Sequence, residues 1–342
     1  MKTNWKVISV LAVVLMAAFF AGCDKNDEVK LLLEDEYFSV QDGTLHSGTV
    51  PANTSGETVG DITINRNALA GGSSYVSINS EKQISEVYFG VTGVDGYFSV
   101  PILATNNSPS LRTAASDAIL NTFILLFSQK LNGSFEIQIS ARLSDGTITA
   151  VYKAQINHIE AGTGGLQISL SFNNEKDVDL YVVQPDGRVI YYGDSGENAD
   201  DSDTGDQIVV WGLDIDSNAE CYIDGINNEN IFYPRDYIQT GKYEVWVNMY
   251  KNCDQSIATN WVITATKEGS LVTPSYGQNP ATGVFPVGTP SNGIGSDLNE
   301  KAIKVMEFTM QGTASSTATT NSSNSSISEL AKIKLKNAGV NF

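Results

Sequence analysis

Two pairs of carboxylates on apolar segments are the residues whose types and spacing could do chemistry. One residue separates Asp177 from Asp179, and one separates Asp214 from Asp216. In a strand, residues i and i+2 point to the same face, so each pair would place two negative charges side by side. These charges repel each other unless water solvates them or a cation binds between them. Clustered carboxylate oxygens are ligands that Ca²⁺ prefers.

The segment after Leu213 is similar in part to a calcium-binding loop. Asp214, Asp216 and Asn218 match positions 1, 3 and 5 of the EF-hand pattern. Position 6 is Ala219 and position 12 is Gly225, which excludes an EF-hand. Hard oxygen ligands without a His or Cys cluster still favour Ca²⁺ over zinc. The expected calcium ligands are Asp177, Asp179, Asp214, Asp216, Asn218 and Glu229.

The charge of the chain excludes one class of partner. Lys and Arg number 21 against 39 Asp and Glu, for a net charge of −18. Most of this excess lies in residues 174–236, with sixteen acidic and three basic residues. Phosphate backbones would be repelled, so we expect no nucleic-acid partner. A solvated acidic face is the alternative to a metal site, and we expect it for the run at 200–203, which lies in a Gly/Asp-rich stretch.

Signals for catalysis are weak. The chain has two histidines; His46 is expected in a solvated loop, and His158 in a packing or edge role at a strand end. The tetrapeptide Gly-Asp-Ser-Gly at 193–196 coincides with the sequence around the nucleophile of chymotrypsin-like proteases. A nucleophilic serine needs an adjacent base, and both histidines lie in the other predicted domain. We therefore expect a protein that is not an enzyme.

Alternating apolar residues predict β-strands as the elements that hold these side chains. The runs Phe135–Ala141 and Ile148–Ile156 enclose an Asp-Gly turn, which is typical of a hairpin. A second alternating series begins with Leu166–Phe172, and only Leu111–Leu120 has a helical pattern. The predicted fold is all-β, with two antiparallel β-sandwich domains in tandem, the first of them immunoglobulin-like.

Composition divides the chain into six segments. The glycine-rich stretch 161–165 is typical of a flexible linker, and the Ser/Thr-rich stretch after residue 311 has no apolar period. The predicted segments are a signal peptide at 1–22, a tether at 23–30, a first sandwich at 31–160, the linker at 161–165, a second sandwich at 166–311, and a tail at 312–342 in which residues 329–336 could form a short helix.

The N-terminus has the pattern of an export signal. Two lysines precede the apolar run Val7–Phe20, which is short for a membrane span of about 20 residues and typical of a signal peptide. Phe-Ala-Gly-Cys at 20–23 resembles the lipobox of bacterial lipoproteins, in which the cysteine is acylated. This resemblance implies a lipid anchor on Cys23 and attachment to the outer membrane of the cell envelope, facing the periplasm or the cell surface. The alternative is an ordinary cleaved signal.

Four motifs in the second predicted domain resemble the YfaP-like family of bacterial secreted domains. They are Asp-Val-Asp-Leu-Tyr-Val-Val-Gln-Pro-Asp-Gly-Arg-Val-Ile-Tyr-Tyr-Gly at 177–193, Gly-Leu-Asp-Ile-Asp at 212–216, Glu-Asn-Ile at 229–231 and Gly-Lys-Tyr-Glu-Val-Trp-Val at 241–247. The resemblance covers residues 166–268. The resemblance implies a YfaP-like β-sandwich that holds a metal. It does not indicate which activity the domain has.

The remaining cysteines, Cys221 and Cys253, form an even pair in a chain with an export signal. Such a pair is typical of a disulfide. In the chain-entropy model, a disulfide between them would stabilise the folded protein by roughly 3–4 kcal/mol. Acidic neighbours disfavour a reactive thiolate, so we expect a structural disulfide.

The expected function is that of a lipid-anchored, non-enzymatic envelope protein that binds calcium and presents a surface to a glycan or protein ligand. One alternative is a glycan-binding module without metal, and another is an inert spacer or assembly component. The aromatic residues that could stack on sugar rings are Tyr191, Tyr192, Trp211, Tyr222, Tyr233 and Trp246.

Overall fold

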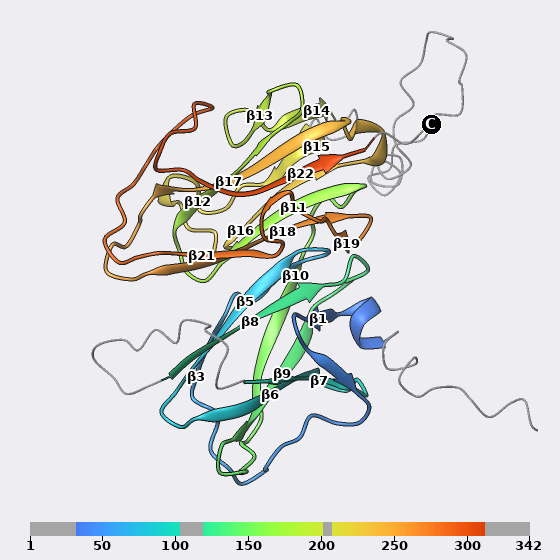
Figure 1. Cartoon of the computed structure of the whole chain (residues 1–342), viewed down its shortest axis with the longest axis vertical. Helices are drawn as coiled ribbons and strands as arrows, with labels where there is room; N and C mark the ends of the chain where they lie inside the picture. Colours follow the sequence, from blue (N-terminus) through green and yellow to red (C-terminus); the bar gives the residue numbers. More distant parts are fainter. Residues whose placement is uncertain (1–31, 103–118, 201–206, 312–342) are drawn as a thin grey trace, which may run out of the picture.

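The computed structural model describes residues 32–102, 119–200 and 207–311. The predictions for the signal peptide, Cys23, the tether, residues 111–118 and the tail lie outside these ranges. The described part is built almost entirely of β-strands in four sheets, which form two sandwiches one above the other (Figure 1). This confirms the predicted all-β fold. Each sandwich has its own hydrophobic core, drawn from 33–156 in the first and 166–310 in the second.

The first sandwich pairs a four-stranded sheet with a six-stranded one. The smaller sheet has the order β1 (Phe38–Val40), β8 (Ile119–Phe127), β5 (Ser73–Ser80), β3 (Asp61–Ile64). The larger has the order β2 (Thr44–His46), β7 (Tyr97–Pro101), β6 (Ile84–Val91), β9 (Phe135–Leu143), β10 (Tyr152–Ile159), β4 (Asn67–Leu69). β9 and β10 form the predicted hairpin. Among the described strands, β4 and β10 are the only parallel pair.

The second sandwich places a seven-stranded sheet on a five-stranded one. The first has the order β14 (Gly196–Asp200), β15 (Gln207–Ile215), β16 (Asn228–Tyr233), β11 (Leu166–Phe172), β18 (Thr259–Lys267), β19 (Ser270–Leu271), and β21 (Ala281–Phe285) pairs with β18. The second has the order β13 (Val189–Ile190), β12 (Asp177–Val183), β17 (Gly241–Lys251), β22 (Ile303–Met310), β20 (Tyr276–Gly277).

Both faces of β11 are buried, for different reasons. Its alternate residues Leu166, Ile168 and Leu170 belong to the second core, where each apolar side chain contributes about 1.5–3 kcal/mol by burial. The residues between them, including Gln167 and Ser169, face the first sandwich and are buried too. Gln167 Nε2 donates to the carbonyl of Ala70 (2.9 Å). The polar side of this alternation therefore forms a contact between the sandwiches and does not face solvent.

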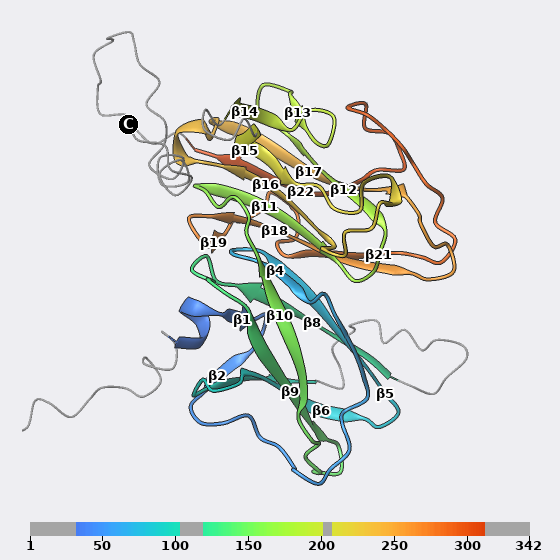
Figure 2. The same cartoon turned by 180° about the vertical axis from the view of Figure 1, so that it is seen from behind.

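The linker runs from β10 in the first sandwich to β11 in the second (Figure 2). Hydrogen bonds to Asp214 and Asn230 hold it. The amide of Gly162 donates to the Asp214 carboxylate, which also accepts from Asn230 Nδ2 (2.7 Å). A Cβ on Gly164 would lie 2.4 Å from the carbonyl oxygen of Tyr233. Side chains at Gly162 and Gly164 would collide with β16, and one at Gly165 would collide with Arg235 and Ile238. Close packing therefore accounts for the glycines of the predicted flexible joint at 161–165.

A long connection from β21 to β22 covers the outer face of β12 and β17 (Figure 1, orange to red). Asn248 Nδ2 on β17 donates to the carbonyl of Asn292 (2.8 Å), and Asn292 Nδ2 donates back to Asn248 Oδ1 (2.7 Å). The hydroxyl of Tyr181 on β12 donates to the carbonyl of Ile294 (3.2 Å). This connection helps to shield the face of β12 that carries Asp179.

Replacing Gly164 by Ala should destabilise the protein by about 1–3 kcal/mol, because the added methyl group forces the backbone at Tyr233 to shift. Thermal unfolding measures the effect, with Thr163→Ala as the neighbouring control. A Gly164→Ala protein that melts with the wild type would show that the linker is not confined by β16.

Candidate metal centre

Three carboxylates meet at one end of the second sandwich. Asp179 lies on β12, Asp216 directly follows β15, and Glu229 lies on β16. One oxygen from each lies within 4.8 Å of the other two. Asp179 and Glu229 are only 2 % and 1 % exposed, whereas Asp216 is exposed. Oxygens this close could share one cation, since Ca²⁺ binds oxygens at about 2.3–2.6 Å.

Backbone and hydroxyl donors orient the two buried members. Glu229 Oε2 accepts from the amide of Leu180 (3.1 Å), and its Oε1 accepts from the amide of Ser217 (3.2 Å). Asp179 Oδ2 accepts from the hydroxyl of Tyr181 (2.9 Å). Glu229 points between the sheets because its neighbours on β16 alternate to the opposite face, where Asn230 holds the linker.

A fourth carboxylate lies beside the three. Asp177 is 1 % exposed, and its Oδ2 accepts from the amide of Glu220 (2.7 Å). The nearby charge of Asp177 helps to raise the pKa of Asp179, while Val178 and Leu180 point into the second core. The strand period therefore places the two aspartates on one face, as the sequence predicts. Two neighbouring buried carboxyl groups need either protons or a cation.

Burial dominates the electrostatics of the group. Burial raises the pKa of Asp177 to about 6. Burial, followed by the nearby charge of Asp177, raises the pKa of Asp179 well above its usual value. The pKa of Glu229 is raised in the same way, by burial and then by Asp179. Burial also raises the pKa of Asp216, because protein surrounds part of its carboxyl group although the residue as a whole is exposed.

Lys and Arg side chains do not neutralise this group. Within the described ranges, no ion pair reaches Asp177, Asp179, Asp216 or Glu229. The nearby Lys251 is paired with Glu220 (2.7 Å). Buried carboxylates in proteins are ordinarily paired or bound to metal. At neutral pH this group therefore needs protons or a cation.

Asp214 does not join the group, and its prediction as a ligand is wrong. Leu213 pairs with Ile231 and Ile215 pairs with Asn230, so Asp214 is the extra residue of a β-bulge. The bulge breaks the alternation that would have placed Asp214 and Asp216 together. The Asp214 carboxylate instead binds the linker and Asn230.

Asn218 is also not placed as a ligand, which corrects the predicted EF-hand-like spacing. Its Nδ2 donates to the carbonyl of Lys176 (3.0 Å) and to Asn227 Oδ1 (2.8 Å), and its Oδ1 accepts from the amide of Asp224 (3.1 Å). These bonds use both ends of the amide. Asn218 therefore folds the loop that follows Asp216 and holds it against β12.

The predicted disulfide joins Cys221 to Cys253, with Cα atoms 5.7 Å apart. Cys221 and Glu220 both have left-handed φ angles, 65° and 54°, which cost energy for residues other than glycine. The disulfide ties the loop that begins at Asp216 to the end of β17. It thereby restrains both Asp216 and the Glu220 amide that binds Asp177.

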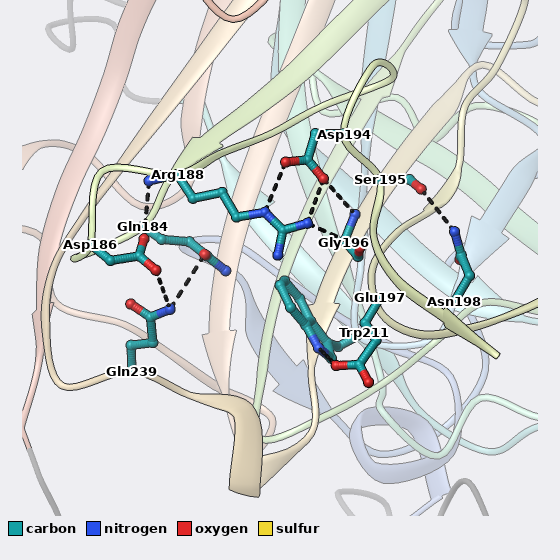
Figure 3. A network of polar contacts seen from close by, with 10 residues as sticks. All are labelled: Gln184, Asp186, Arg188, Asp194, Ser195, Gly196, Glu197, Asn198, Trp211 and Gln239. Atoms are coloured by element: carbon teal, nitrogen blue, oxygen red, sulfur yellow. Dashed lines mark hydrogen bonds and ion pairs between the residues drawn. The ribbon is translucent and has the colours of Figure 1, made fainter.

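A network around Arg188, which lies between β12 and β13, was missed by the sequence analysis (Figure 3). Arg188 donates twice to the Asp194 carboxylate (2.8 and 2.5 Å) and once to the carbonyl of Gly196 (3.0 Å). Its guanidinium lies 5.0 Å from the centre of the Trp211 ring, and Trp211 Nε1 donates to Glu197 (2.8 Å). The local Tyr-Tyr-Gly-Asp sequence could have suggested a turn, but not its arginine.

The protease-like tetrapeptide at 193–196 belongs to this network. Asp194 is engaged by Arg188, and Ser195 Oγ accepts from Asn198 Nδ2 (3.3 Å). Both histidines lie in the first sandwich. His46 is not in a solvated loop as predicted: it lies on β2, with Nε2 2.9 Å from Ser99 Oγ and its ring stacked on Tyr97. His158 lies near the end of β10.

The six candidate sugar-stacking residues differ in how deeply their side chains are buried. Trp211 and Tyr233 belong to the second core, which excludes them as surface platforms. Trp246 is half-buried and points away from Val245 and Val247, which are in the core. Tyr191 is half-buried, whereas Tyr192 and Tyr222 are exposed by 38 % and 83 %.

Comparisons with known proteins give little guidance. No family model matches the chain, and no curated protein matches it. Among solved structures, the fibronectin(III)-like modules of Clostridium thermocellum CbhA are 13 % identical, over 61 % of this chain and 86 % of that chain, with a TM-score of 0.16. So low a TM-score supports no inference about the site. Within the described ranges, no helix has the length and apolar character to cross a membrane.

The metal-free protein should lose stability as pH rises from about 5 to 8. The folded pKa of each buried acid lies above its unfolded value, so the folded state binds more protons across this window. Thermal unfolding in EDTA measures the slope, and Glu229→Gln should flatten it. A melting temperature that stays constant or rises with pH would contradict the assignment of raised pKa values.

Proposed function

We propose that the second sandwich binds one Ca²⁺ ion through Asp179, Asp216 and Glu229, with Asp177 beside them. The observation that carries this proposal is the meeting of two buried carboxylates with a third, without an ion-pair partner within the described residues. The sequence expectation named six ligands. The proposal keeps four carboxylates and leaves out Asp214 and Asn218, because other contacts engage them.

The donor set favours calcium among the common metals. All candidate ligand atoms are carboxylate oxygens, and Ca²⁺ takes six to eight oxygens in flexible geometry. Zinc and copper sites use imidazole or thiolate ligands, and the two cysteines beside the site are bonded to each other. The carboxylates come from three separate segments, and water or a bound ligand would complete the coordination of the ion.

Calcium would act as a structural clamp. It would neutralise acids on β12 and β16 and hold the loop after β15, whose residues Asn218, Glu220 and Cys221 have left-handed φ angles. Binding to the folded state alone stabilises a protein by mass action. The clamped loops would then present a fixed surface at this end of the sandwich.

The motifs that resemble the YfaP-like family support the proposal. The motif at 177–193 contains Asp177 and Asp179, the motif at 212–216 contains Asp216, and the motif at 229–231 contains Glu229. The three carboxylates that meet, and Asp177 beside them, therefore all fall within segments that carry the resemblance. Asp214 lies in one of these motifs as well, where its role is to hold the linker.

We further propose that the protein acts without catalysis at the cell envelope, anchored to the outer membrane by acylated Cys23. The export-signal pattern at 1–22 and the lipobox-like sequence support this location. The disulfide supports it as well, because disulfides persist in oxidising compartments outside the cytosol.

Excess Ca²⁺ should raise the melting temperature of the wild type at pH 7.5, because the ion binds only the folded carboxylate group. Asp216→Asn should reduce calcium affinity at least tenfold in isothermal titration calorimetry. Asp214→Asn is the matched control: it removes an equal charge two residues away and should keep the affinity. Equal losses in both variants, or no binding by the wild type, would contradict the proposed site.

Replacing Cys23 by Ala should abolish incorporation of a labelled fatty acid and move the protein from the membrane fraction to the soluble fraction. Metabolic labelling in a Gram-negative host measures this. The control is Cys221→Ala, which removes a different cysteine. Labelling that persists in Cys23→Ala would contradict the lipid anchor.

A further inference from the structure

Four tyrosine rings form a continuous row that starts at the carboxylate group. Tyr181, whose hydroxyl donates to Asp179, stacks on Tyr191 with ring centres 5.4 Å apart. Tyr191 packs edge-on against Tyr192 (4.9 Å), and Tyr192 packs edge-on against Tyr250 (5.0 Å). Exposure increases along the row, from Tyr181 in the interior to Tyr192, which is 38 % exposed.

Tyr250, the last tyrosine of the row, is linked to the carboxylate group through Glu220. The Tyr250 hydroxyl donates to Glu220 Oε1 (3.1 Å), and the amide of Glu220 donates to Asp177. Tyr222, two residues further along this loop, is 83 % exposed. The tyrosines therefore border the carboxylates at the surface where Asp216 is exposed.

Hydrogen bonds hold Tyr191 and Tyr192, the middle of this row, in place. Tyr191 and Asp194 exchange two backbone hydrogen bonds (3.1 and 3.0 Å), and the bidentate Arg188 ion pair fixes Asp194 (Figure 3). The Tyr192 hydroxyl donates to the carbonyl of Ile294 (2.9 Å). Rings held in this way lose little conformational entropy when a ligand covers them. The Arg188 network thus positions a surface next to the carboxylates.

Charge limits what this surface can accept. The surrounding segment 174–236 is strongly acidic. The two lysines near the site are engaged elsewhere: Lys251 is paired with Glu220, and the buried Lys176 donates to Asn252 Oδ1. An anionic ligand would be repelled, and a cationic group cannot coordinate Ca²⁺. Three carboxylates leave coordination positions open on an ion that takes six to eight oxygens. Neutral hydroxyl oxygens beside an apolar ring face satisfy both requirements.

We propose that this surface binds a neutral glycan, with vicinal hydroxyls of one sugar on the calcium ion and sugar rings against Tyr192 and Tyr222. The inference rests on the proposed calcium site and deepens it by naming the ligand class. It also combines two functions that the sequence analysis gave as alternatives, calcium binding and the stacking of sugar rings on tyrosines. Tyr192 and Tyr222 supply ring faces, while Asp179, Asp216 and Glu229 hold the ion.

Biolayer interferometry of the full soluble chain on immobilised mannan, galactomannan and dextran tests the proposal, with hyaluronan as an acidic comparison. Binding to at least one neutral polysaccharide should require Ca²⁺ and disappear in EDTA. Tyr192→Ala and Tyr222→Ala should each weaken it about tenfold while calcium affinity in calorimetry stays unchanged. The control is Tyr276→Ala, which removes another exposed tyrosine, on β20, and should have no effect.

The outcomes separate the two proposals. If calorimetry shows calcium binding but none of the three neutral polysaccharides is retained, the glycan inference fails and the calcium proposal stands. Retention that persists in EDTA, or retention by hyaluronan alone, also overturns the inference. If calorimetry shows no calcium binding, both fail. Tyr222→Ala keeps the test decisive if Tyr192→Ala does not fold, because Tyr222 makes little contact with the rest of the protein.

Discussion

The burial of several carboxylates close together is the constraint on which the proposed calcium site depends. Asp177, Asp179 and Glu229 are almost fully buried, and burial raises the pKa of each of them. The charge of Asp177 raises the pKa of Asp179 further, and the charge of Asp179 raises that of Glu229. Desolvated charges of one sign are unfavourable unless protons or a cation compensate them. The surrounding fold nevertheless holds them together with backbone amides, a tyrosine hydroxyl and a disulfide-tied loop. A protein that needed only a packed sandwich would place apolar residues here.

Sequence patterns predicted the parts of the structure that follow strict periods. The alternation from Leu166 to Phe172 corresponds to β11, and the spacing of Asp177 and Asp179 places both on one face of β12. Glu229, marked by its motif, lies on β16 within the group. These predictions succeeded because side-chain direction in a regular strand depends only on position along the strand.

Other features depend on tertiary contacts that no local pattern contains. The bulge at Asp214 reverses the side-chain alternation, so the second Asp-x-Asp pair is divided between the linker and the carboxylate group. The linker glycines were interpreted as flexible, but β16 packs closely against them. The polar side chains of β11 meet the first sandwich, a contact that the alternation of the strand does not reveal. In each case the partner is distant in the sequence.

A crystal structure from crystals grown with Ca²⁺ at pH 7.5 tests the central claim most directly. We expect an anomalous difference peak with oxygens of Asp179, Asp216 and Glu229 at about 2.3–2.6 Å from it. A map with no peak there, and with the carboxyl groups hydrogen-bonded to one another in place of an ion, would contradict the account.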